Sequence, residues 1–154
     1  MKRLVSLLLC AILLFTCCVF PASAENEEAL LTSPSFESAS ETAETRATGL
    51  ILIYGLEISV TGTSIKILAR TYCDDSVVKS GFKNLTVQRK KVTDSSWADY
   101  HEYGDLYNES YSASINTTLA VESGYQYRVT CKHYAKKNIL LTQSISNTSN
   151  VVYL

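Results

Sequence analysis

From Gly49 onward, apolar and polar residues alternate in short runs that are separated by turn residues. The run LEISV at 56–60 is the first clear example, and the turn TGT follows it. Alternation with a period of two places successive side chains on opposite faces of a β-strand, whereas a helix needs a period of 3.6. No stretch from Gly49 to Leu154 shows the helical period. The sequence therefore predicts an all-β domain.

The same pattern divides this part of the chain into about seven strands. They are expected at 56–60, 64–73, 82–91, 97–103, 111–120, 125–135 and 139–146, with 151–154 completing the last strand after a bulge. A loop is expected at 104–108, and a hairpin turn at 136–138. Many short strands with turns between them are typical of an antiparallel two-sheet sandwich, which is the fold class we predict.

The N-terminal part of the chain reads as an export signal. Lys2-Arg3, the apolar run at 4–20 and the small residues at 21–24 are the three parts of a secretory signal peptide, with cleavage after Ala24. The apolar run is shorter than the roughly 20 residues of a comfortable membrane span. We therefore predict a signal peptide at 1–24 and a secreted protein with no stable membrane anchor after cleavage.

Residues 25–48 separate this signal from the domain. They are rich in Ser, Thr and Glu and show no sustained periodicity, so we predict a disordered acidic linker at 25–48 and a β-sandwich domain at 49–154. The linker has six Glu and one Arg, whereas the domain has eleven Lys or Arg and nine Asp or Glu. Nucleic-acid binding needs a clustered basic footprint, and this balance predicts no such partner.

One motif points to a known type of sandwich. Residues 121–131 read VESGYQYRVTC, which resembles the turn into strand F of fibronectin type III domains, Leu-x-Pro-Gly-x-x-Tyr-x-Val-x-Val, with Ser123 in place of Pro. The resemblance implies a fibronectin type III or immunoglobulin-like sandwich. Gly124 would let the backbone turn between sheets, and Tyr127 would bury its ring and bond its hydroxyl back to the main chain.

The arrangement of the whole chain also resembles a family of small secreted proteins from Gram-positive Firmicutes that has no assigned function. The shared features are the signal peptide, the acidic linker, the boundary RATG at 46–49, a Trp-bearing hairpin and the Gly-x-x-Tyr-Arg-Val motif. This resemblance implies an origin and a fold, and no activity.

Only two cysteines, Cys73 and Cys131, remain after the predicted cleavage. Strands B and F of such a sandwich run in the same sense on opposing sheets, and both cysteines share parity with the apolar face. Two cysteines in an exported domain indicate a disulfide, worth about 4 kcal/mol in the loop-entropy model. A pair of buried free thiols is the alternative.

The residue types of a catalytic or metal site do not occur in a recognisable spacing. The two histidines, His101 and His133, lie in no metal-type or triad motif, and we predict that both are strand-surface residues. The acidic loops at 74–75 and 105–109 resemble no calcium loop, and turn formation explains them. We expect no catalytic residue, no metal and no cofactor.

Two functions remain open at this stage. The first is a non-catalytic module that binds an extracellular glycan or protein surface. The alternative is a secreted hydrolase or toxin-like effector whose site is assembled from separated carboxylates such as Asp99, Glu102 and Asp105.

The expected ligand surface is the aromatic strand at 97–103. Alternation places Trp97, Asp99, His101 and Tyr103 on one side of it, and Tyr107 on the following loop would extend the surface. Large rings beside hydrogen-bonding groups suit sugar stacking or protein anchoring. The competing interpretation is that Trp97 covers an open edge of the core.

Overall fold

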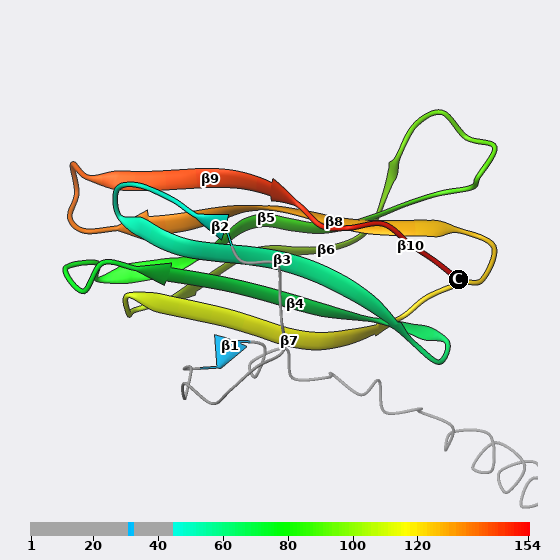
Figure 1. The fold of residues 1–154 in the computed structure, drawn as a ribbon, viewed down its shortest axis with the longest axis horizontal. Coiled ribbons are helices and arrows are strands. Elements are labelled where there is room, and N and C mark those ends of the chain that lie inside the picture. Colours follow the sequence, from blue (N-terminus) through cyan, green and yellow to red (C-terminus); the bar gives the residue numbers. More distant parts are fainter. Residues whose placement is uncertain (1–30, 33–44) are drawn as a thin grey trace, which may run out of the picture.

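The computed structural model describes residues 31–32 and 45–154, so the predicted signal peptide and most of the predicted linker lie outside the described residues. Two antiparallel sheets pack face to face (Figure 1), which confirms the predicted β-sandwich. Within the described ranges, no helix has the length and hydropathy to cross a membrane.

Each sheet joins a hairpin of two consecutive strands to a third long strand from later in the chain. In the first sheet, β3 (Ile51–Thr61), β4 (Ser64–Cys73) and β7 (Ser112–Ala120) lie in the order β7-β4-β3, flanked by β1 (Leu31–Thr32) and β2 (Thr45–Arg46). In the second sheet, β6 (Ala98–Asn108), β5 (Lys79–Lys90) and β8 (Gln126–Lys136) lie in the order β6-β5-β8. Both β9 (Thr142–Thr148) and β10 (Val152–Tyr153) pair with β8, along successive parts of it.

The boundaries differ from the sequence expectation at several places. β3 and β5 begin at Ile51 and Lys79 rather than at 56 and 82, and β9 begins at Thr142, so the expected strand start at Ile139 is wrong and 139–141 lie on the turn. The predicted loop at 104–108 is wrong, because β6 continues to Asn108. Gly104 has φ of 73° and lies at a break in the β5–β6 register, so it bends the strand where we expected it to end. Ordered pairing also begins earlier than Gly49, since Arg46 on β2 already pairs with Ile53 on β3.

The core lies between the sheets and follows the alternation of the strands. The main cluster joins both sheets and contains thirteen buried residues: Leu56, Ile58, Ile65, Ile67, Ala69, Phe82, Leu85, Val87, Ala113, Ile115, Tyr127, Val129 and Cys131. A smaller cluster of Ile51, Cys73, Val77 and Ala135 closes one end of the sandwich.

The motif at 121–131 forms a tight corner between the sheets. Gly124 has φ of 86°, a conformation that a residue with a Cβ rarely adopts. Tyr127 is fully buried, and its hydroxyl donates to the carbonyl oxygen of Glu122 at 2.7 Å. Burial of the ring therefore leaves no unpaired hydroxyl in the core.

The predicted disulfide is wrong, because Cys73 and Cys131 are buried free thiols. Thr71 on β4 hydrogen-bonds to His133 on β8, so these two residues face each other, and two residues further on Cys73 packs with Ala135. Cys131 instead precedes His133 by two positions. The cysteines thus lie about four residues apart along the strands, or about 13 Å, whereas a disulfide needs Cα atoms within about 7 Å.

We expect both thiols to be modified by iodoacetamide only after unfolding. Burial raises the pKa of Cys73 and of Cys131 to about 12, and Asp74 adds to the effect on Cys73, so neither forms a thiolate at neutral pH. Peptide mass spectrometry should find Cys73 and Cys131 alkylated in denaturant without reductant and unmodified in the native protein. A peptide pair linked through these two sulfurs would contradict the structure.

Candidate binding face

The outer face of the β6-β5-β8 sheet has an uneven charge distribution. Strands β5 and β8 carry no carboxylate, and six of their cationic side chains lie on this face: Lys79, Lys83, Lys90, Arg128, Lys132 and Lys136. The seventh, Arg89, shares the parity of the buried Val87 and forms an ion pair with Glu122 at 3.0 Å. The carboxylates of this sheet lie on the edge strand β6. The fold therefore gathers a cationic face from a domain whose overall charge is close to neutral.

At one end of this face, Trp97 lies among cations. The guanidinium carbon of Arg128 is 4.4 Å from the Trp97 ring centroid, and the ammonium nitrogen of Lys90 is 5.3 Å from it. Arg128 Nε donates to Gln88 Oε1 at 2.9 Å, and Gln88 Nε2 donates to Asp99 Oδ1 at 2.8 Å. A continuous polar chain thus crosses β8, β5 and β6 beside the indole.

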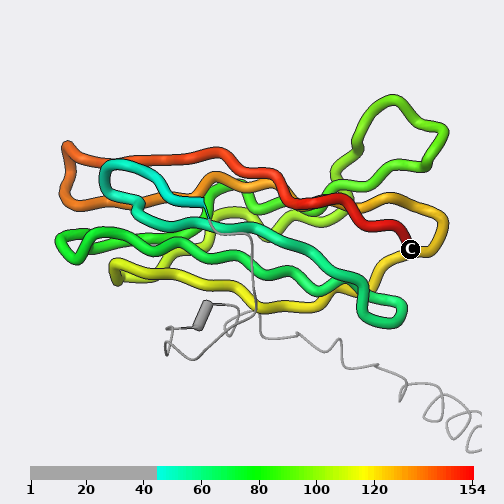
Figure 2. The backbone as a smooth tube through the Cα atoms, in the orientation of Figure 1, coloured from blue at the N-terminus to red at the C-terminus, as the bar shows by residue number. Residues whose placement is uncertain are grey.

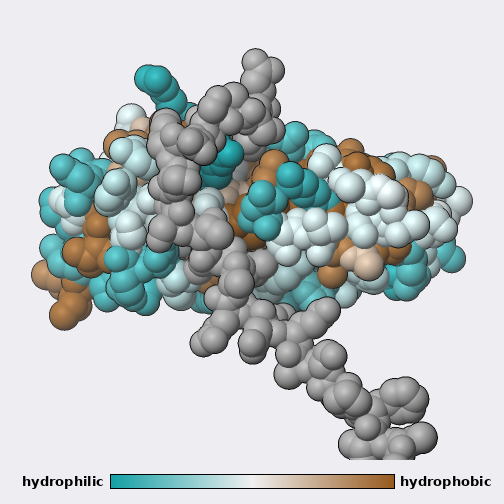
Figure 3. Space-filling view, turned by 90° about the horizontal axis from the view of Figure 1, so that it is seen from below, coloured by the Kyte–Doolittle hydropathy of each residue, from teal (hydrophilic) through white to brown (hydrophobic). Residues whose placement is uncertain are grey.

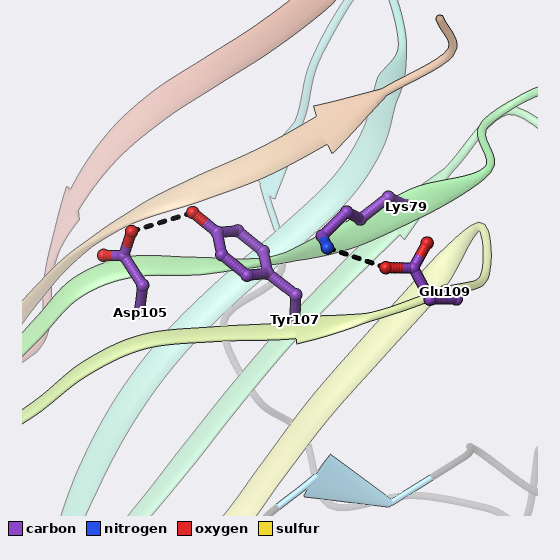
Figure 4. A network of polar contacts seen from close by, with 4 residues as sticks. All are labelled: Lys79, Asp105, Tyr107 and Glu109. Carbon is purple, nitrogen blue, oxygen red and sulfur yellow. Dashed lines mark hydrogen bonds and ion pairs between the residues drawn. The ribbon is translucent and has the colours of Figure 1, made fainter.

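A second aromatic cluster lies toward the other end of the same face. The Tyr107 hydroxyl donates to Asp105 Oδ2 at 2.8 Å, and Lys79 Nζ forms an ion pair with Glu109 at 2.6 Å (Figure 4). Lys79 Nζ also lies 4.8 Å from the Tyr107 ring centroid. Cation–π contacts of this kind orient the ammonium group and the ring together.

The ring of Tyr134 on β8 joins this cluster. It meets the Tyr107 ring edge-on with 5.3 Å between centroids, and Lys83 Nζ lies 4.3 Å from the Tyr134 centroid. The backbone N–H of Asn84 and the Tyr107 hydroxyl lower the pKa of Asp105, so its carboxylate stays ionised. Burial and the neighbouring Asp105 raise the pKa of Tyr107, so its hydroxyl stays protonated.

The structure divides the predicted ligand residues between these places. Trp97 and Asp99 belong to the first cluster and Tyr107 to the second, and the His101 ring meets the Tyr103 ring edge-on at 4.5 Å. Tyr103, however, packs against the main core, so its predicted place on the ligand side is wrong.

The reason for the Tyr103 error is the irregular register of β6. The pairing shifts between Leu85 and Thr86 and again between Val87 and Gln88, which leaves Tyr103 and Tyr100 as extra residues opposite β5. Both extra rings pack against the core. Simple alternation fails across such bulges because each one adds a residue that has no partner.

Sequence reasoning missed the residues that β5 and β8 contribute. Arg128 and Tyr134 come from β8, which is far from Trp97 in the chain and joins the face through the β5–β8 pairing. Gln88 and Lys90 come from β5, which pairs with β6 next to Trp97. A signal was present in β8, where cationic side chains recur at Arg128, Lys132 and Lys136 on the side opposite to the buried residues.

The predicted surface position of His133 is also wrong, because its side chain is fully buried. Asn147 Oδ1 accepts from the Thr148 N–H, which turns Asn147 Nδ2 toward His133 Nε2 at 3.3 Å. Nε2 is therefore an acceptor, and Nδ1 donates to Thr71 Oγ1 at 2.7 Å. Thr71 in turn donates to the Gly81 carbonyl at 3.4 Å. With the imidazole neutral, the donors of Thr71, His133 and Asn147 in this buried hydrogen-bond network each meet an acceptor.

Cys131, His133 and Asn147 are residue types of a thiol nucleophile site, but their protonation does not suit that chemistry. Cys131 Sγ lies 3.8 Å from His133 Nε2 in the core. Burial raises the pKa of Cys131 to about 12 and lowers that of His133 to about 4. The pair is therefore neutral at pH 7, whereas a nucleophilic cysteine needs a lowered pKa and access to substrate.

Asp99 and Asp105, two of the carboxylates of the hydrolase alternative, do not converge on one site. Asp99 accepts from Gln88 at one end of the face, whereas Asp105 accepts from the Asn84 N–H and from Tyr107 at the other. In the part of the chain that the structure describes, no three His, Cys, Asp or Glu side chains are grouped to hold a metal ion. These contacts give that alternative no support.

Comparison with protein-family models, with curated proteins and with solved structures finds no match for this chain.

Proposed function

We propose that this protein is a secreted, non-catalytic β-sandwich module that binds an acidic extracellular glycan with the outer face of β6-β5-β8. The observation that carries the proposal is the placement of aromatic rings among cations on two neighbouring strands that have no carboxylate. Export rests on the signal-peptide pattern at 1–24, and the origin in Gram-positive Firmicutes rests on the resemblance described above.

We further propose that the sandwich is of the fibronectin type III kind. The strand orders β7-β4-β3 and β6-β5-β8-β9 support this, because they divide consecutive strands between the sheets as such domains do. The bond from the Tyr127 hydroxyl to the Glu122 carbonyl, a few residues upstream, also supports it. Folds of this type host many functions, so the site has to carry the functional argument.

The chemistry of the face suits a polyanionic sugar chain. Ring faces supply contact area at low entropic cost, and cations pair with carboxylate or sulfate groups of a glycan. The hydrogen bond to Gln88 uses only Nε of Arg128, so the N–H groups on the two terminal guanidinium nitrogens are not used in that bond and can donate to a ligand. Asp99 and Gln88 add hydrogen-bonding groups that would orient sugar hydroxyls.

We expect Arg128→Gln to weaken binding to an acidic polysaccharide about tenfold, because one charge-assisted hydrogen bond is worth roughly 1.5–3 kcal/mol. Trp97→Ala should act in the same direction through lost stacking. Binding to a polyuronate, a sulfated glycan and neutral dextran is measured by isothermal titration. Lys66→Gln on β4, in the opposite sheet, is the matched control and should bind as wild type.

Three results would overturn the proposal. Equal binding to dextran would remove the requirement for acidic sugars, and equal binding to a single-stranded oligonucleotide would reduce the face to a nonspecific polyanion site. Unchanged affinity of the two variants, with each still folded by circular dichroism, would place the ligand elsewhere. Capture of a cell-surface protein by the same face, with no glycan bound, would replace the glycan by a protein partner.

A further inference from the structure

The tip of the β8–β9 hairpin exposes three consecutive aliphatic side chains. Ile139, Leu140 and Leu141 are 89%, 95% and 47% exposed. Scattered exposed apolar residues are common, but three adjacent large ones on one turn are unusual and mark an interaction surface. Hydrophobic atoms also protrude in Figure 3 at the end of the molecule where this hairpin lies.

The backbone of the turn holds these side chains outward. Asn138 Oδ1 accepts from the N–H groups of Leu140 and Leu141 at 3.0 and 2.9 Å, and the Lys137 N–H donates to the Leu141 carbonyl at 3.0 Å. Three N–H groups and one carbonyl of the turn are thereby paired within the turn itself. The tip is therefore a preformed apolar projection, in which this pairing lowers the cost of moving backbone groups out of water.

Cations lie directly behind the apolar tip. From Ser123 to Leu154 the chain contains no Asp or Glu, and Lys132, Lys136 and Lys137 precede the tip. Asp74 on the neighbouring β4–β5 turn interacts with Lys137 and offsets part of this charge. The same turn also adds an exposed apolar residue, Val78, whose N–H donates to the Lys136 carbonyl.

We propose that the β8–β9 hairpin docks the protein on an anionic lipid bilayer, with Ile139, Leu140 and Leu141 inserted and Lys136 and Lys137 at the headgroups. The placement of the lysines fits this occupant. Lys136 is the last residue of β8 and Lys137 opens the turn, so both cations lie at the base of the projection that carries Ile139 and Leu140, as headgroup contacts behind inserted apolar groups require.

The charge order along the hairpin favours a bilayer over a protein groove. A bilayer presents its anionic layer outside its apolar layer, and the hairpin presents apolar residues first and lysines behind them. The Trp97 and Arg128 end of the proposed glycan face is separate from the tip, since these residues lie toward the opposite end of the sheet. The loop at 91–97 and the β8–β9 hairpin project from opposite ends of the sandwich (Figure 2).

The test is sedimentation of the protein with vesicles of phosphatidylcholine alone or with about one third phosphatidylglycerol. We expect binding to the anionic vesicles and at least a tenfold weaker partition for the double variant Ile139→Ser, Leu140→Ser. The double variant Lys136→Gln, Lys137→Gln should lose binding that is sensitive to salt. All variants carry the same N-terminus, so any binding through residues 4–20 is common to them.

Val92→Ser is the matched control. Val92 is 64% exposed, follows the basic triplet at 89–91 and lies on the loop at the far end of the sandwich, so its replacement should leave vesicle binding unchanged. The Ile139→Ser, Leu140→Ser variant should keep wild-type affinity for acidic glycans, whereas Arg128→Gln should keep wild-type vesicle binding. Failure of one proposal is thereby distinguishable from failure of the other.

A direct readout comes from Leu140→Trp in a Trp97→Phe background. Its emission should shift to the blue on anionic vesicles and be quenched by brominated lipid. Equal sedimentation of wild type and the Ile139→Ser, Leu140→Ser variant, or an unshifted emission, would overturn the proposal. So would sedimentation equilibrium showing that wild type dimerises and this variant does not, because the tip's occupant would then be a second copy of the chain.

Discussion

Replacing Gly81 with alanine is expected to destabilise the domain by more than about 3 kcal/mol, at the upper end of the usual cost of overpacking. A Cβ at Gly81 would lie 2.1 Å from the Leu106 carbonyl oxygen and 2.8 Å from the Tyr107 Cα. Both atoms belong to the backbone of β6, so no side chain can move aside. The β5–β6 ladder would have to separate next to the fully buried Phe82.

Urea unfolding followed by circular dichroism measures this effect. The expected loss is a large part of the roughly 5–15 kcal/mol by which small domains are stable, so Gly81→Ala should be partly unfolded in dilute buffer. Gly62→Asn is the control, because Gly62 has φ of 61°, which Asn tolerates, and nothing lies within 4 Å of its Cβ position. A destabilisation by Gly81→Ala of only about 1 kcal/mol lies at the low end of overpacking costs. Such a result would contradict the close contact between β5 and β6.

Acidification is expected to remove about 3 kcal/mol of stability through His133 alone. Burial lowers the pKa of this imidazole from 6.5 to about 4. At a pH between these two pKa values, His133 therefore binds a proton in the unfolded chain but not in the folded protein. The contribution is fully present above about pH 6.5, declines as the pH falls, and is lost by about pH 4.

The physical cause is the acceptor role of Nε2. Protonation would place an N–H against the donor Asn147 Nδ2 at 3.3 Å in a site without a carboxylate partner. The free energy of unfolding is measured in urea at intervals from pH 7.5 to 4. His133→Gln should flatten this profile, because it removes the titrating imidazole. A profile for His133→Gln as steep as that of wild type would assign the titration to another group.

The fold class could be predicted from the sequence because sandwich strands leave a local signature. The strand predicted from Ser64 to Cys73 has the same boundaries in the structure, since alternation and turn residues define a strand with two unlike faces. The turn at 121–131 is equally local, because Gly124 and Tyr127 act within a few residues of each other.

Errors arose where the structure departs from regular alternation or depends on the other sheet. The bulges of β6 turned Tyr103 into the core, and no local pattern distinguishes a bulge from a strand end at Gly104. His133 shares the parity of Val129 and Cys131 and was still expected at the surface, because a polar residue is buried only where partners such as Thr71 and Asn147 meet it.

The sequence by itself determined the alternating strands and the corner at Tyr127, because each depends on neighbours in the chain. It placed 139–141 in a strand, whereas β9 begins only at Thr142 and leaves these residues on the turn. The tertiary structure alone decided that the two cysteines lie at different levels of the sandwich, since parity says which face a residue occupies but not how far along the strand its partner lies. It also decided the cationic face, because the pairing of β5 with β8 gathers charges that the near-neutral composition conceals.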